Sequence, residues 1–333
     1  MKKVLLPFLA VVIITSCKVT PERDYTKLDG FAQGTTYSIT FYDSLNRDLS
    51  IGIEEIIEAV DSSMSLYREN SIINRFNNSK NGIEVDSLLA DVVRLSLDYS
   101  IKTNGAFDIT VGPLIKTWGF YGKQGEVPSD DKVKSIMRFV GHDKIWLENN
   151  FLHKQHPEVT IDVNAIAQGY VVDLISEFFE SKGVNDYLVE LGGEIRTKGV
   201  SPRGDHWLVG IDRPDDHALS GENLQVTLKL SGESLVTSGN YRKFYERDGV
   251  RYSHTINPKT GYPVTHNLLS ATVINKTSAG ADALATAFMV MGTESVKKWL
   301  KGNGHIEAFL ISSNKEGEYE VWMTEKLKRR VVE

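Results

Sequence analysis

The chain has one cysteine, Cys17, among its 333 residues. A disulfide within the chain is therefore impossible, and an exported domain with this sequence depends on its packed core alone for stability. The eight histidines show no metal-ligand spacing, which disfavours a zinc site. If Cys17 is itself modified, no thiol is left for cysteine catalysis.

Several common chemical motifs are also missing. There is no Walker-type glycine loop followed by Lys-Ser/Thr, no Gly-x-Gly-x-x-Gly opening a helix, and no His-Glu-x-x-His. The formal charge of -6 at pH 7 argues against nucleic acid as a partner, because nucleic acid favours a basic face. Oxygen ligands and backbone-rich loops remain, and they favour phosphate or pyrophosphate chemistry with a hard metal ion.

The N-terminus has the pattern of an export signal. Lys2 and Lys3 precede an apolar run over residues 4–14, and Thr15-Ser16 leads to Cys17. Residues 1–16 are therefore predicted to be a lipoprotein signal peptide, with palmitate-type lipidation at Cys17 and anchoring to the extracytoplasmic face of a bacterial membrane. The alternative is an ordinary signal peptide followed by a chance cysteine. Removal of residues 1–16 takes away two lysines and moves the formal charge from -6 to -8.

After the predicted cleavage point, residues 17–29 are expected to form a polar tether and residues 30–333 one domain. Alternating or short apolar runs predict strands at residues 35–42, 159–163, 187–191, 207–212, 224–230, 235–237, 269–274, 308–311 and 319–323. Apolar residues at helical spacing predict helices at residues 51–64, 87–102, 165–181, from about 279, and 294–300. Short turns join successive strands in the second half, which favours antiparallel pairing and an α+β fold.

The stretch from Gly280 to Ala287 predicts a helix of small residues that can bind a metal. Asp282 and Thr286 are four residues apart, so their oxygens lie on one helix face, with about 6 Å between them. Alanine and glycine around them leave room for a hard cation and for phosphate oxygens. The alternative is that Asp282 only favours the helix N-terminus and Thr286 only packs.

Three further segments are candidates for ligand contact. Thr237-Ser238-Gly239 ends a strand with two hydroxyls and a glycine, and Gly192-Gly193 lets a ligand approach the backbone. Each is equally consistent with an ordinary turn or bulge. His254 has the titration range of a general base, although a lone histidine beside a turn also suits a surface or capping role.

Taken together, these segments resemble those of one family, the ApbE-type FAD:protein FMN transferases. Eight segments match in order: 34–37, 65–67 with 71–74, 105–114 with 118–120, 161–170 with Asp173, 191–193, 237–239, 254–263 and 281–287. The resemblance covers residues 30 to 300, almost the whole predicted domain.

The resemblance implies a T-fold-like α+β scaffold, with mostly antiparallel sheets and packed helices. It also implies Mg²⁺-dependent protein flavinylation, in which the FMN half of FAD moves to a Ser or Thr hydroxyl of an exported protein and AMP is released. By the same analogy, the metal ligands are Asp282 and Thr286, with backbone carbonyls from Ala165 and Ala285. His254 is the expected base. Contacts to FAD are expected from Gln33, Tyr67, Ala106, Phe107, Asp108, Asp162, Gln168, Thr237, Ser238, Gly239 and Ile256.

Tyr67 and Phe107 are expected to stack on a ring of FAD. Three positions depart from the family pattern: Gln168 replaces a frequent Lys, Gln33 a common Met, and Asn257 a frequent Asp. Two other functions stay open. One is a metal-dependent FAD pyrophosphatase that releases FMN and AMP, and the other is a lipid-anchored flavin-binding protein without activity. The resemblance implies acceptors among exported subunits of respiratory complexes, either Na⁺-translocating NADH:quinone reductase or Rnf-type proteins.

Overall fold

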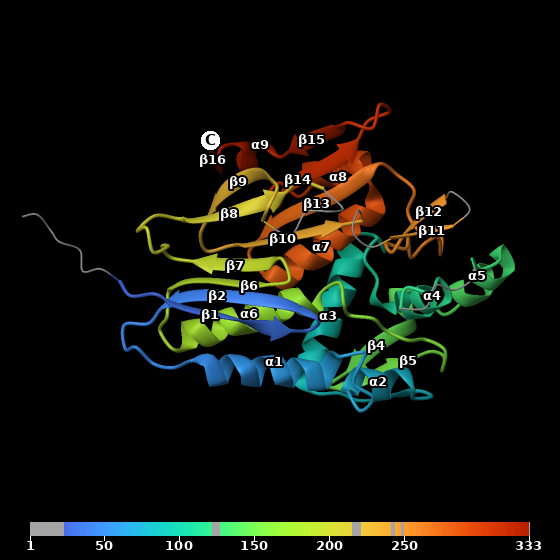
Figure 1. The fold of residues 1–333 in the computed structure, drawn as a ribbon. Coiled ribbons are helices and arrows are strands. Elements are labelled where there is room, and N and C mark those ends of the chain that lie inside the picture. The colour runs from blue at the N-terminus through green and yellow to red at the C-terminus, as the bar shows by residue number, and fades with distance from the viewer. Residues whose placement is uncertain (1–22, 122–126, 215–220, 241–243, 248–249, 333) are drawn as a thin grey trace, which may run out of the picture.

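The computed structural model describes residues 23–332 except 122–126, 215–220, 241–243 and 248–249. Its centre is an eight-stranded sheet in which all neighbouring strands are antiparallel, in the order β1-β2-β6-β7-β10-β13-β14-β15 (Figure 1). These strands are β1 (Thr26–Ala32), β2 (Thr35–Tyr42), β6 (Asp186–Leu191), β7 (Glu194–Lys198), β10 (Ser234–Gly239), β13 (Leu268–Asn275), β14 (Glu307–Ser313) and β15 (Tyr319–Met323).

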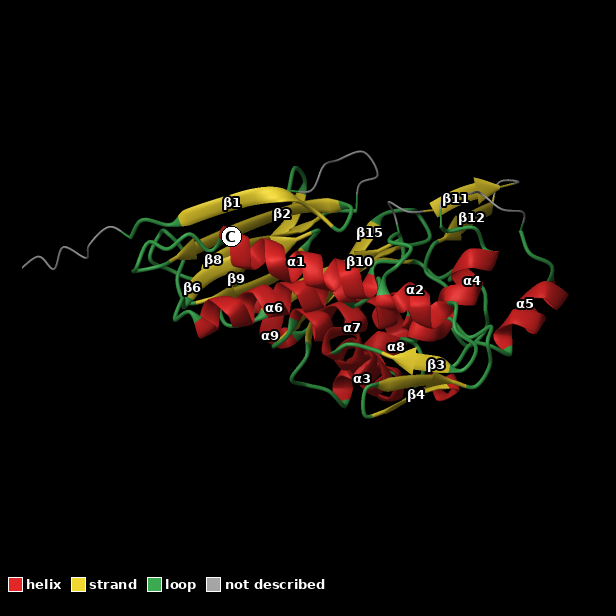
Figure 2. Ribbon diagram, turned by 90° about the horizontal axis from the view of Figure 1, so that it is seen from below, coloured by secondary structure: helices red, strands yellow, loops and turns green. Residues whose placement is uncertain are grey.

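Helices cover one face of this sheet. The layer is built mainly from α1 (Ser50–Met64), α3 (Ser87–Lys102), α6 (Ala167–Ser181) and α7 (Ser278–Met291). The view in Figure 2 shows α1, α6 and α7 side by side beneath the strands. The smaller helices are α2 (Ile72–Asn77), α4 (Gly112–Thr117), α5 (Asp130–Met137), α8 (Thr293–Lys301), α9 (Glu325–Lys328) and the 3-10 turns η1 (Ile109–Val111) and η2 (His142–Lys144).

A small sheet of β8 (Trp207–Asp212), β9 (Leu224–Leu230) and β16 (Val331–Val332) covers part of the opposite face. Its apolar side chains share one cluster with residues of β10, β13 and β14. Two further pieces lie at the edges: the sheet of β3 (Gly82–Glu84), β5 (Phe151–Lys154) and β4 (Ile145–Glu148), and the hairpin of β11 (Phe244–Arg247) and β12 (Val250–Ser253).

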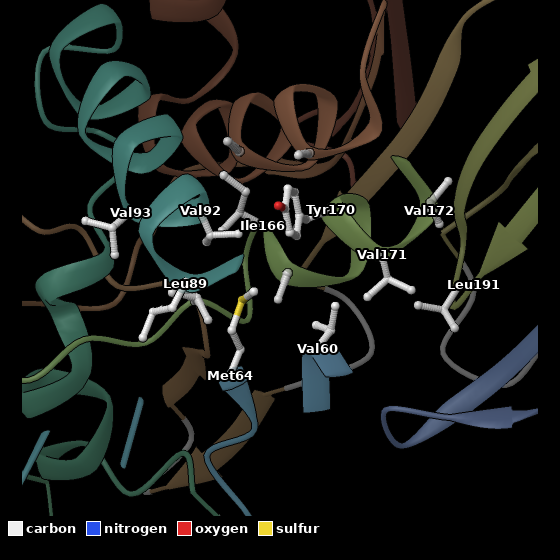
Figure 3. Packing of buried hydrophobic residues seen from close by; sticks show 14 of the residues in the cluster. Val60, Met64, Leu89, Val92, Val93, Ile166, Tyr170, Val171, Val172 and Leu191 are labelled. Atoms are coloured by element: carbon white, nitrogen blue, oxygen red, sulfur yellow. The ribbon is translucent and has the colours of Figure 1, made fainter. Parts of the chain in front are cut away.

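The largest core lies between the helices and strands β2 and β6. Figure 3 shows Met64 of α1, Leu89 of α3 and Tyr170 of α6 converging on it. Leu89 is fully buried and Met64 is 4% exposed. Burial of this kind is the main force that holds helix and sheet layers together.

The expected α+β class with mostly antiparallel sheets is confirmed. The tether prediction needs correction at its end, because β1 already begins at Thr26. Residues 159–163 are buried but form no strand, and α6 begins at Ala167 rather than at residue 165. The signal peptide and Cys17 lie outside the described residues, and no helix among those described is long and apolar enough to cross a membrane.

Candidate functional site

Asp282 and Thr286 lie on α7, as the sequence predicts. The helix begins at Ser278, and its cap Thr277 accepts a hydrogen bond from the Gly280 N–H at 3.3 Å. Thr286 Oγ1 is 3.4 Å from Ser238 Oγ at the end of β10. The predicted metal-binding helix and the predicted strand-end hydroxyl therefore meet.

The first turns of α6 and α7 pack backbone against backbone. A Cβ atom built on Gly169 of α6 would lie 2.6 Å from the Ser278 carbonyl oxygen and 2.8 Å from Ala279 N. Real Cβ atoms do not approach backbone so closely, so only glycine fits at this position. Ala279, Ala283 and Ala287 of α7 are buried in the cluster that includes α6, and their small side chains keep the contact close.

Asp282 lies at this crossing and faces the N-terminus of α6. Its carboxylate accepts a hydrogen bond from the Gly169 N–H at 3.4 Å, a long distance for such a bond. The side chain is 4% exposed. Burial raises the pKa of Asp282 to about 7, and the Gly169 N–H opposes that shift only in part. A buried carboxylate with so little compensation suits a cation as its missing partner.

Asp173 of α6 makes the reciprocal contact with α7. It accepts hydrogen bonds from the Ser278 N–H at 2.8 Å and the Ala279 N–H at 2.9 Å, and it pairs with Arg196 at 2.6 Å. Burial raises the pKa of Asp173, while these donors act against the shift. Asp173 is thus a fully partnered cap of α7 and locks the two helices together.

The two predicted carbonyl ligands have different surroundings. Ala165 lies in the turn just before α6, next to the end of the helix that Asp282 faces. Ala285 is inside α7 and fully buried, so its carbonyl belongs to the helical hydrogen-bond ladder. A metal contact from Ala285 would have to use the second lone pair of that oxygen.

Among the described residues, no three His, Cys, Asp or Glu side chains gather into a metal-binding group. The donors at the crossing are instead one carboxylate, from Asp282, and the neighbouring hydroxyls of Thr286 and Ser238. This all-oxygen set fits Mg²⁺, which keeps several waters and takes few protein ligands when substrate phosphates supply the rest.

Gln168 lies beside the β6–β7 turn. A Cβ built on Gly192 would lie 3.3 Å from Gln168 Nε2 and 2.8 Å from Thr35 Cγ2, so the β1–β2 turn also reaches this place. Gln33, in that turn, has a positive φ of 51° and donates a hydrogen bond from Nε2 to Asp61 of α1 at 3.1 Å. The structure therefore brings Gln168 next to the turn that holds Gln33.

Asp162 is buried and holds a partner that sequence reasoning missed. The Tyr121 hydroxyl donates to Asp162 Oδ2 at 2.7 Å, and Asp162 Oδ1 accepts from the Asn164 N–H at 2.8 Å. Burial raises the pKa of both Asp162 and Tyr121. Tyr67, at 84% exposure, is close enough to Tyr121 to influence its pKa electrostatically. Tyr67 is therefore available to stack on a ligand ring.

Residues 105–108 form a tightly held loop. Asp108 caps η1 by accepting from Thr110 N at 2.8 Å, and its own pKa is raised by burial. Phe107 is 2% exposed and Ala106 5%, and both belong to the main core. The Phe107 ring is therefore packed inside the protein, and contact of this residue with FAD would have to come from its backbone.

The turn after His254 docks on this loop. Lys259 Cε lies 3.5 Å from the place of a Cβ on Gly105, and the Trp118 indole N–H donates to the Gly261 carbonyl at 2.8 Å. Ile256 is 6% exposed and packs in a cluster with Trp118. His254 itself is half-buried directly after β12. These contacts join the predicted base and the 105–108 loop into one region.

Thr237, Ser238 and Gly239 do not share one face of β10. Ser238 points toward α7, whereas Thr237 Oγ1 contacts Thr272 Oγ1 at 2.7 Å across the β10–β13 pair. Side chains alternate along a strand, so Thr237 points to the opposite face from Ser238. Ser238 is thus the member of the three whose side chain lies next to Thr286 on α7.

Sequence reasoning missed two features of the site. Tyr121 lies in a glycine-rich stretch with other aromatic residues, and no sequence pattern in that stretch indicates its hydrogen bond to Asp162. Gly169 stood inside a helical pattern, where an isolated glycine is a signal for close packing. That signal could have identified the α6–α7 contact.

The comparisons with known proteins agree with this geometry. The model of the ApbE family matches residues 33–310. A curated FAD:protein FMN transferase of Vibrio cholerae is 34% identical over 302 residues, covering 88% of this chain and 89% of the relative. The solved flavin transferase ApbE from Vibrio cholerae superposes with a TM-score of 0.83 at 33% identity, over 92% of this chain and 99% of that one. The apo flavinyl transferase ApbE of Pseudomonas stutzeri gives 0.84 at 32% identity, over 92% and 97%. This chain belongs to the ApbE family.

Proposed function

We propose that this protein moves the FMN moiety of FAD onto a Ser or Thr hydroxyl of an exported acceptor protein in a Mg²⁺-dependent reaction that releases AMP. Family membership makes the chain a flavin transferase, an enzyme that transfers a phosphorus-containing group. The observation that carries the finer proposal is Asp282, a buried carboxylate with a single long hydrogen bond, next to the hydroxyls of Thr286 and Ser238.

Asp282 and Thr286 would hold Mg²⁺, with the Ala165 carbonyl beside them. The bound ion would neutralise the pyrophosphate of FAD and favour departure of the AMP phosphate. The exposed Tyr67 would supply a stacking surface, and Gln168 and Asp162 would supply polar contacts for FAD.

A residue of this chain accepts the proton that the acceptor hydroxyl loses. The acceptor hydroxyl oxygen forms a bond to the FMN phosphorus, and the bond from that phosphorus to the bridging oxygen breaks. The imidazole of His254 takes the hydroxyl proton, and AMP leaves with the electron pair of the broken bond. Docking of the 256–264 turn on Trp118 and Gly105 fixes the segment that carries His254.

We further propose that Cys17 is lipidated and anchors the domain to the extracytoplasmic face of a bacterial membrane. The lipobox-like end of the signal sequence, residues 14–17, supports this. We expect the acceptors to be exported subunits of respiratory complexes, of the Na⁺-translocating NADH:quinone reductase or Rnf type, as the family resemblance implies.

The test is a labelling assay with FAD, Mg²⁺ and a purified acceptor domain that carries the target hydroxyl. Covalent flavin fluorescence on the denatured acceptor, lost with EDTA and absent from a Ser/Thr→Ala acceptor, is the expected result. Release of free FMN and AMP with no labelled acceptor would establish the pyrophosphatase instead. If FAD binds but neither labelled acceptor nor free FMN forms, the protein is a flavin-binding protein without enzymatic activity.

A further inference from the structure

The first described residues, from Arg23 onward, already make specific contacts with the domain. Arg23 pairs with Asp186 at the start of β6, and its guanidinium lies 5.3 Å from the centre of the Tyr42 ring. The Tyr25 hydroxyl donates to the Val200 carbonyl at 2.7 Å, and its ring packs on Tyr42. The N-terminal segment thus enters the fold at the end where β2 finishes and β6 begins.

The short distance along the chain to Cys17 limits how far this end can move from a membrane. Arg23 follows Cys17 by only six residues, which can span at most about 20 Å even when fully extended. This step rests on lipidation of Cys17, as proposed above. With a lipid on Cys17, the Arg23 end of the domain stays within that distance of the bilayer.

The site lies at the other end of the same strands. β2 runs from Tyr42, beside Arg23, to Thr35, whose side chain lies beside Gly192. Eight residues of strand cover about 23 Å. Figures 1 and 2 agree that the start of β1 and the hairpin β11–β12, which precedes His254, are at opposite ends of the molecule.

The surface at the Arg23 end is suited to lipid. Two large aliphatic side chains project into solvent at this end, Leu45 at 68% and Ile51 at 64% exposure. The turn that presents Leu45 is rigid, because Asp43 accepts hydrogen bonds from Arg47 at 2.8 Å and from the Leu45 N–H at 3.3 Å. Arg47 also donates to the Lys182 carbonyl at 2.7 Å and so ties the turn to the end of α6.

Charge at this end is mixed, because Asp48, Glu54 and Glu55 are exposed near Ile51 while the buried Asp43 is paired. Asp43 is neutralised by Arg47, whose guanidinium holds the pKa of that carboxyl far below its usual range. The Lys182 side chain is exposed on the same corner. Exposed aliphatic side chains at an end that is tethered close to a bilayer suit the boundary between lipid headgroups and acyl chains.

We propose that the end of the domain formed by Leu45, Ile51 and Lys182 rests on the bilayer that carries the Cys17 lipid, with the flavin-transfer end directed away from it. The site then lies about 23 Å above the membrane surface, the length of β2. The partner must therefore present its hydroxyl at that height, as the water-exposed domain of a membrane protein does.

The test uses the lipidated full-length protein in phosphatidylcholine/phosphatidylglycerol vesicles. Leu45→Cys and Phe31→Cys are each labelled with an environment-sensitive nitrobenzoxadiazole dye. Phe31 is a matched control, because it is 73% exposed and lies at the far end of β1. We expect a blue shift and quenching by doxyl lipids for the label at position 45, and quenching only by aqueous iodide for the label at position 31.

Two results would contradict the inference, and a separate activity measurement serves as the control. Equal quenching by iodide at both positions, with the protein floating with the vesicles, would overturn the orientation and leave the lipid anchor intact. Failure to float would overturn both the anchor and this inference. Flavin transfer to a soluble acceptor domain, measured on the same samples, reports separately on the enzyme and on the folding of both labelled variants.

Discussion

Asp173 and Asp282 are both buried aspartates that face the first turn of a neighbouring helix, yet their partners differ. Asp173 on α6 receives two short amide hydrogen bonds and the guanidinium of Arg196. Asp282 on α7 receives the Gly169 N–H at 3.4 Å. The same residue type thus serves as a structural lock in one helix and keeps a single long hydrogen bond in the other.

The difference follows from what each helix can bring near the carboxylate. Arg196 reaches Asp173 from β7, so that charge is balanced within the protein. Around Asp282, α7 offers alanines and α6 offers Gly169, and none of these side chains can neutralise a carboxylate. The small residues that permit close helix packing therefore also leave the carboxylate of Asp282 without a neighbouring positive charge from either helix.

The largest expected effect is the loss of flavin transfer in Asp282→Asn. The amide keeps the volume and an acceptor for the Gly169 N–H but removes the charge that holds Mg²⁺. We expect acceptor labelling to fall by about 10³-fold, in line with the loss of a major electrostatic contribution. Labelling by fluorescence and Mg²⁺ binding by calorimetry measure the effect. Wild-type Mg²⁺ affinity in this variant would contradict Asp282 as the metal ligand.

Next in size is the pH dependence of stability in the metal-free protein. Asp282 has a pKa of about 7 in the folded state and an ordinary value near 3.8 in the unfolded chain. The folded state therefore binds more protons between pH 4 and pH 7, and the free energy of unfolding falls as pH rises through this window. The fall amounts to at most roughly 4 kcal/mol.

Urea titrations in EDTA across this pH range measure that slope. Asp282→Asn has nothing to titrate there, so it should show a smaller slope and exceed the wild type in stability at pH 8. Saturating Mg²⁺ should restore wild-type stability and leave the variant unchanged. A wild-type slope in the variant would show that other groups dominate.

Asp173→Asn is expected to act on stability rather than on chemistry. The change removes the nearer counter-charge of Arg196, whose side chain is 17% exposed and whose other carboxylate partner, Glu180, is 3.8 Å away, and it weakens the capping of α7. We expect the free energy of unfolding to fall by roughly 3 kcal/mol, the scale for breaking a buried ion pair. Denaturant unfolding gives the value, and labelling at low temperature should show nearly normal turnover per folded molecule. An Asp173→Asn variant that is as stable as the wild type but inactive would contradict a purely structural role of Asp173 and so remove the contrast with Asp282.

The sequence predicted the regular elements well where apolar residues keep one period. The helix at 87–102 and the strands at 35–42 and 207–212 have the predicted bounds. The strand predicted at residues 159–163 is wrong, because an apolar run indicates that a segment is buried but not which groups its backbone pairs with. Here the backbone of Ile161 pairs with the side chain of Asn77, more than eighty residues away.

The candidate site divides in the same way. Spacing on a small-residue helix indicated Asp282 and Thr286, because an i, i+4 pair shares a face whatever surrounds it. The sequence could not show that Asp282 has a single long hydrogen bond while Asp173 has three partners, since that depends on Arg196 and on where α6 crosses α7. It also could not separate Thr237 from Ser238, whose faces depend on the strand register.

The smallest predicted effect concerns the segment that leads into the site. Asn77 donates to the Ile161 carbonyl at 3.0 Å and accepts from the Ile161 N–H at 2.8 Å, while the buried Lys154 ammonium donates to the carbonyls of Asn77 and Val159. Asn77→Ala leaves both Ile161 groups without these bonds, so the free energy of unfolding should fall by roughly 1–3 kcal/mol.

Ile161 directly precedes Asp162, and the same segment continues to Ala165 before α6. Loosening it should therefore raise the KM for FAD more than it lowers kcat, because binding groups shift while Asp282 stays fixed on α7. Asn78→Ala is the matched control, since Asn78 is exposed at the end of α2 and should change stability by less than about 0.5 kcal/mol. We regard α7 as the fixed side of the site and the 159–165 segment as its adjustable side. A loss of kcat with unchanged KM in Asn77→Ala would contradict this distinction, because it would place the segment in the chemical step.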